Sequence, residues 1–538
     1  MRRRQAVLVA AAVLAATVPV TASAVKAPVA VPRVGVFQSV HNDTSRPLRD
    51  LVRLPVVRRP GTIVQEPVRT PVEQGPFTYD PVLQKAEAAA VTPATTVRNF
   101  EGIGADYPGY TPNAVPPDTA GAAGRTQYVQ WVNLSIAVFD KRTGKALVGP
   151  APGNSVFAEF GGECEQRNDG DPIVNYDRFA NRWVIQQFAV TNGNYECIAV
   201  SKTPDATGAY HRYAFKYTGM NDYPKTGVWR DGYYNTYNMF SGESGAKVCA
   251  MDRAKMLVGK AATQQCVQLP PQYTSLLPAD NDGTRLAPAG SPMPLVALGP
   301  NSLRMWSFKV DWSRPSRSKL TGPVPVEVAA YRQACLTGAT LRATCVPQPG
   351  TGVVGQLGVV GLDAMPDRPM FRLAYRRFGD GREAMVVTHT VDAMPSAAAA
   401  LRWYELRKVG SGWRVHQEGT YTSDDGVSRW MGSAAMDKAG NIGIGYSVSS
   451  ATTVFPGIRY TGRQARDPLG TLGGERSIVE GLGEQTTASI VSRWGDYSTM
   501  TIDPVDDCTF WYTTEYMNGV GVFAWSTKIA AFKFPSCR

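Results

Sequence analysis

Residues 494–504 read WGDYSTMTIDP, and the chain continues through an Asp-Asp-Cys turn at 506–508 into the aromatic run FWY at 510–512. The phrase thus consists of a Trp-Gly-Asp opening, a hydrophobic run, an Asp-rich turn and a second run rich in aromatic residues. Short hydrophobic runs joined by an Asp or Gly turn are typical of two antiparallel strands. The stretch therefore predicts a β-hairpin.

Related phrases recur along the chain. They begin at residues 171 (DPIVNY), 222 (DYPKTGV), 367 (DRPMFRLAY) and 430 (WMGSAAM), with a looser copy at 118 (DTAGAAG). Further strand-like runs follow several of them, which suggests four strands in units of roughly 45 to 65 residues, a spacing typical of propeller blades with loop insertions. We therefore predict an all-β fold, a β-propeller. It has seven blades if residues 302–310 supply one more, and six blades is the alternative. A pair of β-sandwiches also has short alternating strands, but the repeated opening favours the propeller.

The N-terminal residues predict export. Three arginines at 2–4 precede an apolar run at 6–20 and the small-residue site Ala-Ser-Ala at 22–24, so residues 1–24 are typical of a signal peptide. Residues 25–97 are rich in Pro, Val and Arg and are interpreted as a linker, a pro-segment or an arm on the domain. Residues 98–538 form the predicted propeller domain. No later stretch approaches the roughly 20 apolar residues of a membrane span, and we expect a secreted protein, extracellular or periplasmic.

All eight cysteines follow the predicted signal peptide. An even number of cysteines in an exported chain favours disulfides. Pairing of sequence neighbours would keep each bridge within one local unit. The predicted pairs are Cys164 with Cys197, Cys249 with Cys266, Cys335 with Cys345, and Cys508 with Cys537.

Charge and metal-ligand patterns exclude some functions. The net charge of +11 is spread along the chain, and no basic run with interleaved aromatic residues indicates a nucleic-acid partner. The chain has no Cys-x-x-Cys pair, and its four histidines are scattered. We expect no cofactor and no catalytic metal. The Asp-rich turns at 168–171 and 503–507 offer oxygen ligands for calcium as a stabilising ion.

Three phrases carry a resemblance to a known family. Residues 168–177 (NDGDPIVNYD), 222–225 (DYPK) and 494–497 (WGDY) resemble those of a family of large secreted bacterial proteins of uncharacterised function. The resemblance covers residues 99–537. In general layout such proteins are similar to sialidase-type propellers that bear Asp-box motifs, although this chain has no Ser-x-Asp-x-Gly-x-Thr-Trp sequence. The resemblance implies a propeller fold and an extracellular location.

The repeated openings predict the site. The first strand of each propeller blade lines the central channel, so residues at the openings should converge at one funnel. The expected ligand-binding residues are Asp118, Asp171, Asp222, Asp367 and Asp496, with Trp430, Trp494 and Tyr497 beside them. Carboxylates accept hydrogen bonds from sugar hydroxyls, and aromatic faces cover apolar sugar faces. The alternative is that each Asp only caps a turn.

Residues that differ between the copies are the stronger functional candidates. Arg230, Arg377, Arg429 and Arg493 lie beside openings or turns, and their guanidinium groups suit a carboxylate or sulfate ligand. A sialidase-like centre would use Tyr497 as nucleophile, with Asp496 beside it and help from Glu484 or Glu515. Asp171 or Asp222 would then act as the acid/base.

Three functions follow from these residues. The first is an exported propeller, expected to be a monomer, that binds a polysaccharide or cell-surface glycan at its central funnel. The second is a glycoside-cleaving enzyme that uses the funnel carboxylates and Tyr497. The third is a scaffold whose blade edges bind another protein. The sequence leaves open whether the protein is an enzyme.

Overall fold

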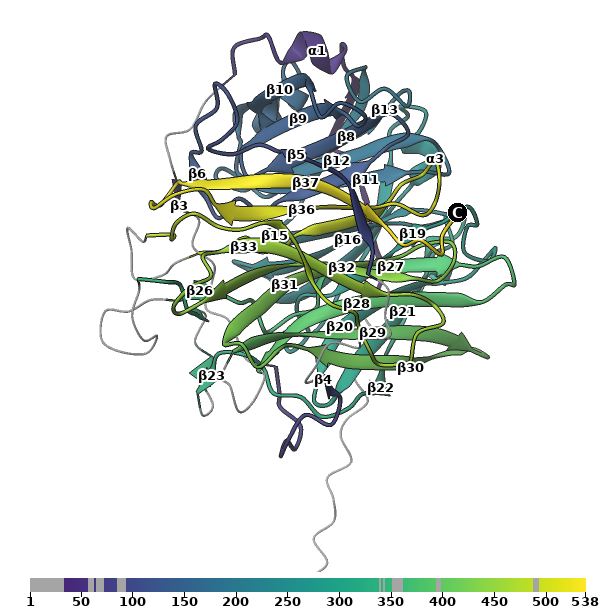
Figure 1. Cartoon of the computed structure of the whole chain (residues 1–538). Coiled ribbons are helices and arrows are strands. Elements are labelled where there is room, and N and C mark those ends of the chain that lie inside the picture. Colours follow the sequence, from purple (N-terminus) through teal and green to yellow (C-terminus); the bar gives the residue numbers. More distant parts are fainter. Residues whose placement is uncertain are drawn as a thin grey trace, which may run out of the picture. The chain divides into compact units, whose positions relative to one another are not determined.

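The computed structural model describes residues 33–56, 62–63, 72–84, 93–337, 340–341, 344–350, 361–392, 398–486 and 493–538. These residues belong to one compact unit that spans Arg33–Arg538. Strands dominate it (Figure 1). The described helices are short: α1 (Leu48–Leu51), α2 (Gly162–Gln166), α3 (Arg253–Met256) and the 3-10 turns η1 (Gly153–Phe157) and η2 (Pro315–Arg317). The predicted all-β class is confirmed.

Most strands belong to antiparallel units of four consecutive strands. The first three units are β7 (Ala120–Ala123), β8 (Gln127–Val132), β9 (Ser135–Asp140) and β10 (Ala146–Pro152); β11 (Gly170–Asp177), β12 (Arg182–Ala189), β13 (Tyr195–Ser201) and β14 (Tyr210–Lys216); and β15 (Met220–Val228), β16 (Tyr233–Phe240), β17 (Gly245–Met251) and β18 (Thr263–Gln268). Each follows the order predicted for one repeated phrase and its following strands.

The next units share one nine-stranded sheet. It contains β19 (Leu277–Asp282), β20 (Met293–Gly299), β21 (Ser302–Lys309) and β22 (Lys319–Glu327), followed by β27 (Met370–Arg377), β28 (Glu383–Asp392), β29 (Ala399–Val409) and β30 (Gly412–Tyr421). The two sets meet through parallel pairing of β19 with β27. Residues 302–310, expected to supply a further blade, include β21.

The remaining units come from the end of the chain. One contains β31 (Val427–Met436), β32 (Ile442–Ser450), β33 (Gly457–Arg463) and β34 (Arg476–Val479). The other joins β35 (Thr499–Ile502), β36 (Phe510–Met517) and β37 (Trp525–Lys533) to β5 (Thr95–Glu101), which comes from much earlier in the sequence. Figure 1 shows β5 beside β37.

The first strands of successive units contact one another around a ring. β7 contacts β11, and the succession continues through β15, β19, β27, β31 and β35, which contacts β7 again. These strands are buried on both faces, as the continuous burial of β31 illustrates. A closed succession of innermost strands, each the first of an antiparallel sheet, is a propeller-like arrangement.

Close packing between units depends on small residues. A Cβ atom added to Gly445 would lie 2.4 Å from the Tyr512 ring of the neighbouring unit. Because real Cβ atoms do not approach other atoms so closely, this position accepts only glycine while Tyr512 keeps its place. The IGIGY sequence at 442–446 thus provides the flat surface on which the aromatic run at 510–512 packs.

Short strands at the N-terminal side extend the outer edges of the units. β1 (Gly35–Gln38) pairs with β18, β2 (His41–Thr44) with β14, and β4 (Leu83–Gln84) with β30. The other described strands form small pairs: β3 (Thr62–Ile63) with β6 (Ala114–Val115), β23 (Leu336–Thr337) with β24 (Thr340–Leu341), and β25 (Thr344–Val346) with β26 (Leu362–Asp363). The described part of residues 25–97 therefore lies as an arm along the sheets.

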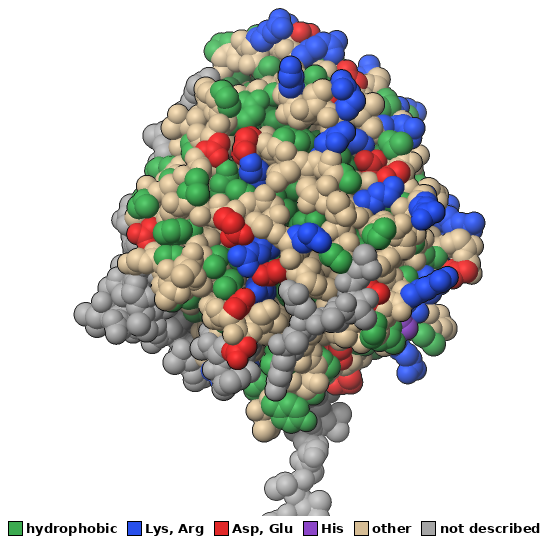
Figure 2. Space-filling model, viewed as in Figure 1, with side chains coloured by type: hydrophobic (Ala, Val, Ile, Leu, Met, Phe, Trp, Pro, Cys, Tyr) green, Lys and Arg blue, Asp and Glu red, His purple; other side chains and the backbone are tan. Residues whose placement is uncertain are grey.

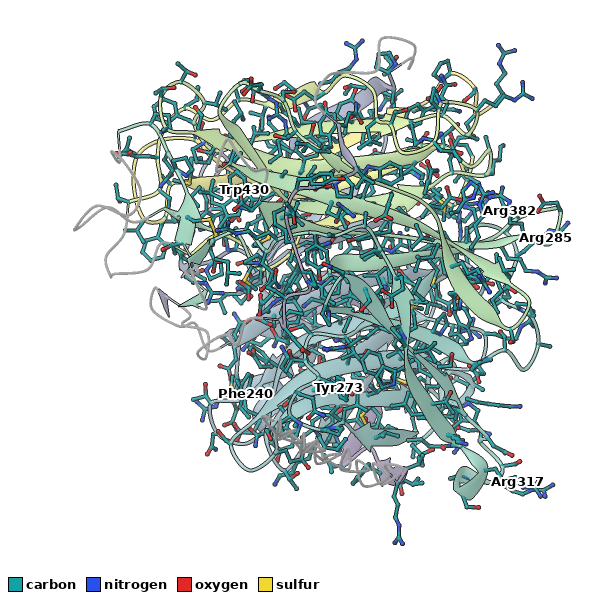
Figure 3. The ribbon with its side chains drawn as sticks, turned by 90° about the horizontal axis from the view of Figure 1, so that it is seen from below. Phe240, Tyr273, Arg285, Arg317, Arg382 and Trp430 are labelled. Atoms are coloured by element: carbon teal, nitrogen blue, oxygen red, sulfur yellow. A yellow bond between two sulfur atoms is a disulfide. The ribbon has the colours of Figure 1, made fainter. Side chains whose placement is uncertain are left out.

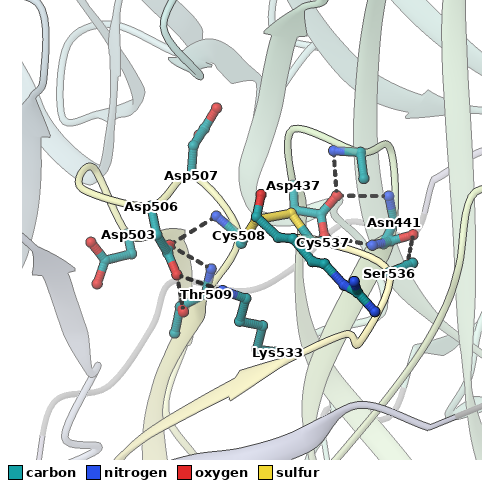
Figure 4. Close-up of a disulfide and its surroundings, with 12 residues drawn as sticks. Asp437, Asn441, Asp503, Asp506, Asp507, Cys508, Thr509, Lys533, Ser536 and Cys537 are labelled. Atoms are coloured by element: carbon teal, nitrogen blue, oxygen red, sulfur yellow. Dashed lines mark hydrogen bonds and ion pairs between the residues drawn. A yellow bond between two sulfur atoms is a disulfide. The ribbon is translucent and has the colours of Figure 1, made fainter.

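Four disulfides join the predicted neighbours, and the expected pairing is confirmed. They link Cys164 to Cys197, Cys249 to Cys266, Cys335 to Cys345, and Cys508 to Cys537. The last bridge ties the chain end to the turn before β36, beside the Asp506 carboxylate that accepts hydrogen bonds from the Cys508 and Thr509 amides (Figure 4). Such bridges are typical of an oxidising environment.

Two surface findings bear on partners. Among the described residues, no helix combines the length and apolar character that a membrane crossing requires. Lys and Arg side chains are most numerous at the top and right of the viewed face, with neutral and acidic side chains between them (Figure 2).

Candidate functional site

The repeated phrase corresponds to a bulge near the start of the innermost strands. The register shifts after Gly170 in β11, Asp222 in β15, Met370 in β27 and Trp430 in β31. At or next to this bulge, Asp171, Tyr223 and Met431 have φ values of 46°, 53° and 55°. A bulge turns side chains away from the regular alternation of a strand. Non-glycine residues in this left-handed region carry strain of the kind found at functional sites.

Lys225 lies at the centre of the residues that these bulges bring together. Its side chain is fully buried. The ammonium Nζ lies 3.4 Å from the centroid of the Tyr223 ring and 3.9 Å from that of the Tyr497 ring, and it donates to the Pro224 carbonyl at 2.9 Å. The two aromatic faces attract the cation. Sequence reasoning missed Lys225, although a lysine in an inner strand is itself a signal.

The charges of three aspartates act on this ammonium group. Burial lowers the pKa of Lys225 to about 8, and the charges of Asp171, Asp496 and Asp118 oppose that decrease. These three openings therefore lie near Lys225. Each comes from a different unit: Asp118 precedes β7, Asp171 lies in β11, and Asp496 precedes β35.

Asn133, in the turn between β8 and β9, connects the aspartates. Its Nδ2 donates to Asp118 Oδ2, and its Oδ1 accepts from the Asp171 amide at 2.9 Å. The other oxygen of Asp118, Oδ1, accepts from the Asp496 amide at 2.6 Å. Burial raises the pKa of Asp118, although the nearby Arg493 charge lowers it. Sequence reasoning did not identify Asn133, because it lies outside the repeated phrases.

Arg493 and Glu515 complete the cluster on the β35–β36 side. Arg493 donates to the Asp496 carboxylate, and its Nε lies 3.9 Å from Asp363 Oδ2. Glu515 accepts a hydrogen bond from the Gly495 amide. Burial, followed by the charge of Asp118, raises the pKa of Glu515 well above its ordinary value. A Cβ atom at residue 495 would lie 2.7 Å from Glu515 Oε1, which explains the glycine of the WGDY phrase.

Tyr497 lies in the cluster, but its environment does not suit a nucleophile. Its hydroxyl donates to the Pro172 carbonyl at 2.8 Å, and only 1% of its surface is exposed. Burial, with the charges of Asp171, Asp118 and Asp496, raises its pKa well above the ordinary value. The phenolate form that a tyrosine nucleophile needs is therefore strongly disfavoured. Instead, its ring faces Lys225 and packs edge-on against Tyr223 and Phe371.

Asp222 lies in β15, and Asp367 lies in the turn before β27. Arg368 holds Asp367 through two hydrogen bonds of 2.9 and 3.0 Å. The guanidinium carbon of Arg368 lies 4.4 Å from the Tyr223 ring centroid, which links this pair to the Lys225 cluster. Asp222 is half-buried, directly before Tyr223. Arg368 was not among the predicted arginines.

Three of the four predicted arginines lie outside the Lys225 cluster, so the prediction that they line one site is wrong for them. Arg230 follows the C-terminal end of β15 and donates to the Ala287 carbonyl at 2.6 Å. Arg377 ends β27, ten residues after Asp367, and ten strand residues span roughly 30 Å. Arg429 turns outward to Asp425 and Glu475, at 2.7 and 2.9 Å. Of the four, only Arg493 joins the cluster.

The predicted tryptophan platforms and Glu484 also require correction. Trp430 and Trp494 pack against each other at 5.6 Å between ring centroids, and both are at most 1% exposed. Trp430 lies among the sheets in Figure 3. The two rings fill the space between units and offer no open face to a sugar. Glu484 lies in the loop after β34, beside Gly350, and none of its described contacts reaches Tyr497.

The opposite end of the innermost strands has a different charge arrangement. Arg372 Nε lies 2.8 Å from Asp280 Oδ2 and Arg372 Nη2 lies 2.7 Å from Asp282 Oδ1. Arg376 and Arg178 hold Asp507 at 2.7 and 3.0 Å. A cavity of about 20 Å³ lies beside Arg372. These pairs are buried and closely matched.

The calcium expectation stays a prediction. In the predicted loops, Asp169 accepts from the Val190 and Thr191 amides, Asp503 pairs with Lys141 at 2.8 Å, and Asp507 pairs with arginines. Among the described residues, no group of three or more His, Cys, Asp or Glu side chains is arranged around a metal position.

Comparison with known proteins identifies no relative by sequence: no family model and no curated protein matches the chain. Solved structures show only a distant likeness. An alpha-L-arabinofuranosidase of Fusarium graminearum matches at 10% identity over 82% of this chain and 99% of its own, with a TM-score of 0.36. The polysaccharide lyase Uly1 matches at 11% identity over 84% and 99%, with a TM-score of 0.33. The WD40 domain of fission yeast SCAP matches at 9% identity over 78% and 96%, also with a TM-score of 0.33. The fold assignment therefore rests on the strand topology above.

Proposed function

We propose that this protein is an exported, seven-bladed β-propeller that binds an extracellular glycan at the N-terminal ends of its innermost strands. The blade number is supported by the division of the nine-stranded sheet at the parallel β19–β27 pairing, which leaves four strands in one unit and four plus the short β4 in the other. Export is supported by the four disulfides and by the signal-like residues 1–24.

The observation that carries the proposal is the convergence of polar side chains from several units around Lys225. Asp118, Asp171 and Asp496 supply acceptors for hydroxyl groups, while Lys225 and Arg493 supply donors. Two of the aspartates adopt left-handed backbone conformations, with φ of 44° at Asp118 and 46° at Asp171. Strained backbone and perturbed pKa values mark a candidate functional site, and the mixture of donors and acceptors fits a polyhydroxylated ligand.

A second candidate, glycoside cleavage, is favoured by one specific observation. Asp118 and Glu515 both have raised pKa values because they are buried, so their protonated forms are favoured. A carboxylic acid kept protonated beside another carboxylate is the arrangement that glycosidases use for acid catalysis. In this version Glu515 or Asp118 is the acid and Asp496 the base, and Tyr497 only positions Lys225.

The proposal is tested with the mature protein on immobilised polysaccharides of defined composition. We expect binding to at least one, and a loss of at least tenfold in affinity for Asp171→Asn, which keeps the side-chain shape but removes the charge. Asp380→Asn is the matched control, because Asp380 is 64% exposed and lies near Arg382. Absence of binding by the wild-type protein, or equal binding by Asp171→Asn, would contradict the proposal.

The same samples separate binding from cleavage. New reducing ends, lost in folded Glu515→Gln but retained in Asp380→Asn, would indicate a glycoside hydrolase. Binding without new reducing ends would indicate a binding protein. Capture of a protein partner that survives Asp171→Asn would favour the scaffold function.

A further inference from the structure

A cavity of about 270 Å³ lies beside the first unit. It is lined by the segment before β7, the turn between β8 and β9, and the end of β10. The lining residues used below are Tyr110, Thr111, Asn113, Leu134, Ser135 and Asn168. Thr111 is exposed and Asn168 is buried, so the cavity extends inward from the surface.

The cavity adjoins the Lys225 cluster through the β8–β9 turn. Leu134 lines it, and the preceding residue, Asn133, holds Asp118 and Asp171. On the other wall, Asn168 Nδ2 donates to the Leu134 carbonyl at 3.0 Å, and Asn168 lies three residues before Asp171. A ligand in the cavity is therefore separated from the aspartates by a single turn of chain.

The cavity wall has the chemistry of a neutral polar site. None of its described lining residues carries a charge. Asn113 Oδ1 is buried and accepts no hydrogen bond from the described residues. This oxygen has almost no accessible surface and so does not face the cavity; the wall instead offers uncharged amide and hydroxyl side chains that suit the hydroxyl groups of a ligand. Tyr110 adds an aromatic ring whose hydroxyl is buried next to Ser135, and burial raises its pKa to about 12, so it stays a neutral donor.

The volume limits the ligand. Pockets that hold drug-sized molecules are about 300–1,000 Å³, and this cavity is slightly smaller than that range. It suits one ring with several hydroxyl groups, not an extended oligomer. The aromatic face of Tyr110 and the apolar Leu134 complement the C–H faces of such a ring.

We infer that this cavity is a binding subsite for one neutral sugar residue of the glycan that contacts the Lys225 cluster. The inference rests on the proposed function and adds the position and charge class of a recognised residue. Neutral sugars are selected because an acidic sugar would bury a carboxylate with no cation in the described wall.

The test measures binding to the polysaccharide selected by the wild-type protein, with free sugars as competitors. Asn113→Ala removes a polar side chain from the cavity wall, and Thr111→Trp places a large side chain at the exposed mouth. We expect each to weaken binding about tenfold. Asn192→Ala, an exposed asparagine outside the cavity lining, is the control and should bind as wild type. Neutral monosaccharides such as glucose, galactose, mannose or arabinose should compete, and glucuronic acid should not.

The outcomes distinguish this inference from the proposed function. If the wild-type protein binds no polysaccharide, the proposed function fails and the subsite with it. If the wild-type protein binds and Asp171→Asn does not, but Asn113→Ala and Thr111→Trp bind normally, only the subsite is overturned. Competition by glucuronic acid alone would overturn the neutral class. Unfolding temperatures of both variants, measured alongside, identify any loss that comes from misfolding.

Discussion

At the C-terminal ends of the innermost strands, buried carboxylates meet arginines in matched pairs: Asp280 and Asp282 with Arg372, and Asp507 with Arg376 and Arg178. At the N-terminal ends, the Lys225 ammonium lies between two tyrosine rings, and burial raises the pKa of Glu515 well above its ordinary value. Burial also raises the pKa of Asp280 at the other end, but there the Arg372 charge opposes the increase. Matched pairs hold a structure together, whereas perturbed groups on strained backbone are typical of sites that bind or react. We therefore propose that the matched end serves stability and that the Lys225 end serves ligand binding.

The largest expected effect is at the matched end. Arg372→Met leaves Asp280 and Asp282 buried without their cation, and removal of one partner from a buried pair costs about 3–5 kcal/mol. We expect the free energy of unfolding in urea to fall by that amount, with ligand binding by the surviving folded protein unchanged. Arg382→Met, at a partly exposed arginine, is the control. A loss below about 1 kcal/mol would show that this end is not the stabilising one.

The next effect concerns Gly495. Gly495→Ala forces a Cβ atom against Glu515 Oε1, and such overpacking costs about 1–3 kcal/mol. The free energy of unfolding should fall by this amount. In a Glu515→Ala background, where the obstacle is gone, the same substitution should cost less than half as much. Equal costs in the two backgrounds would argue against the contact.

A third prediction uses Glu196, a fully buried carboxyl whose Oε2 accepts from Asn221 at 3.0 Å. Burial, then the charge of Asp171, raises its pKa well above the ordinary value of 4.5. At a pH between 4.5 and the raised pKa, the Glu196 carboxyl is ionised in the unfolded chain and protonated in the folded protein. Unfolding then releases a proton, so stability falls as pH rises. Glu196→Gln should make stability fall less steeply as pH rises above 5, by at most about 1.4 kcal/mol per pH unit, as measured by urea unfolding.

The exposed Glu159 provides the control for that slope. Glu159 is half-exposed in its pair with Arg46, so Glu159→Gln should leave the pH dependence of unfolding unchanged. If Glu196→Gln and the wild-type protein have parallel pH profiles, the proton is not held at Glu196.

The smallest effect concerns binding. Burial lowers the pKa of Lys225 to about 8. The fraction of molecules that carry the ammonium form therefore falls from most at pH 7 to about a quarter at pH 8.5. If the ammonium group contacts the ligand, glycan affinity should fall about fourfold over that interval. Lys225→Met should bind weakly with no such dependence, and Lys255→Met, at a partly exposed lysine, should match the wild type. An affinity that does not change between pH 7 and pH 8.5 would place the ligand away from Lys225.

The sequence predicted the fold better than the site. Strand alternation and Asp/Gly turns are local properties, so the units, the strand at 302–310 and the disulfide pairs follow from nearby residues. The convergence of Asp118, Asp171 and Asp496 also follows, because each occupies the same place in its repeat. The repeats could not show that Trp430 and Trp494 pack against each other between units.

Side-chain direction explains the other differences between the predicted site and the site in the structure. Arg230 and Arg377 are near their openings or turns in the sequence, but each lies at the far end of an extended strand, and Arg429 faces the outer side of β31. Lys225 follows the predicted Asp222 by three residues, across the β15 bulge, and Arg368 follows the predicted Asp367 in the turn before β27. The position of a bulge depends on the pairing partner, which a single strand does not specify.

The unit formed by β35–β37 and β5 has a consequence for synthesis. Thr95–Glu101 leaves the ribosome more than 400 residues before its partner Trp525–Lys533, whose pairing begins with Lys528 against Glu101. Until the last residues are made, β5 has a free edge and the ring of units stays open. A chain that stops before residue 525 would therefore keep an unpaired strand that attracts other chains. Premature termination would thus produce aggregation-prone species and not a smaller functional domain.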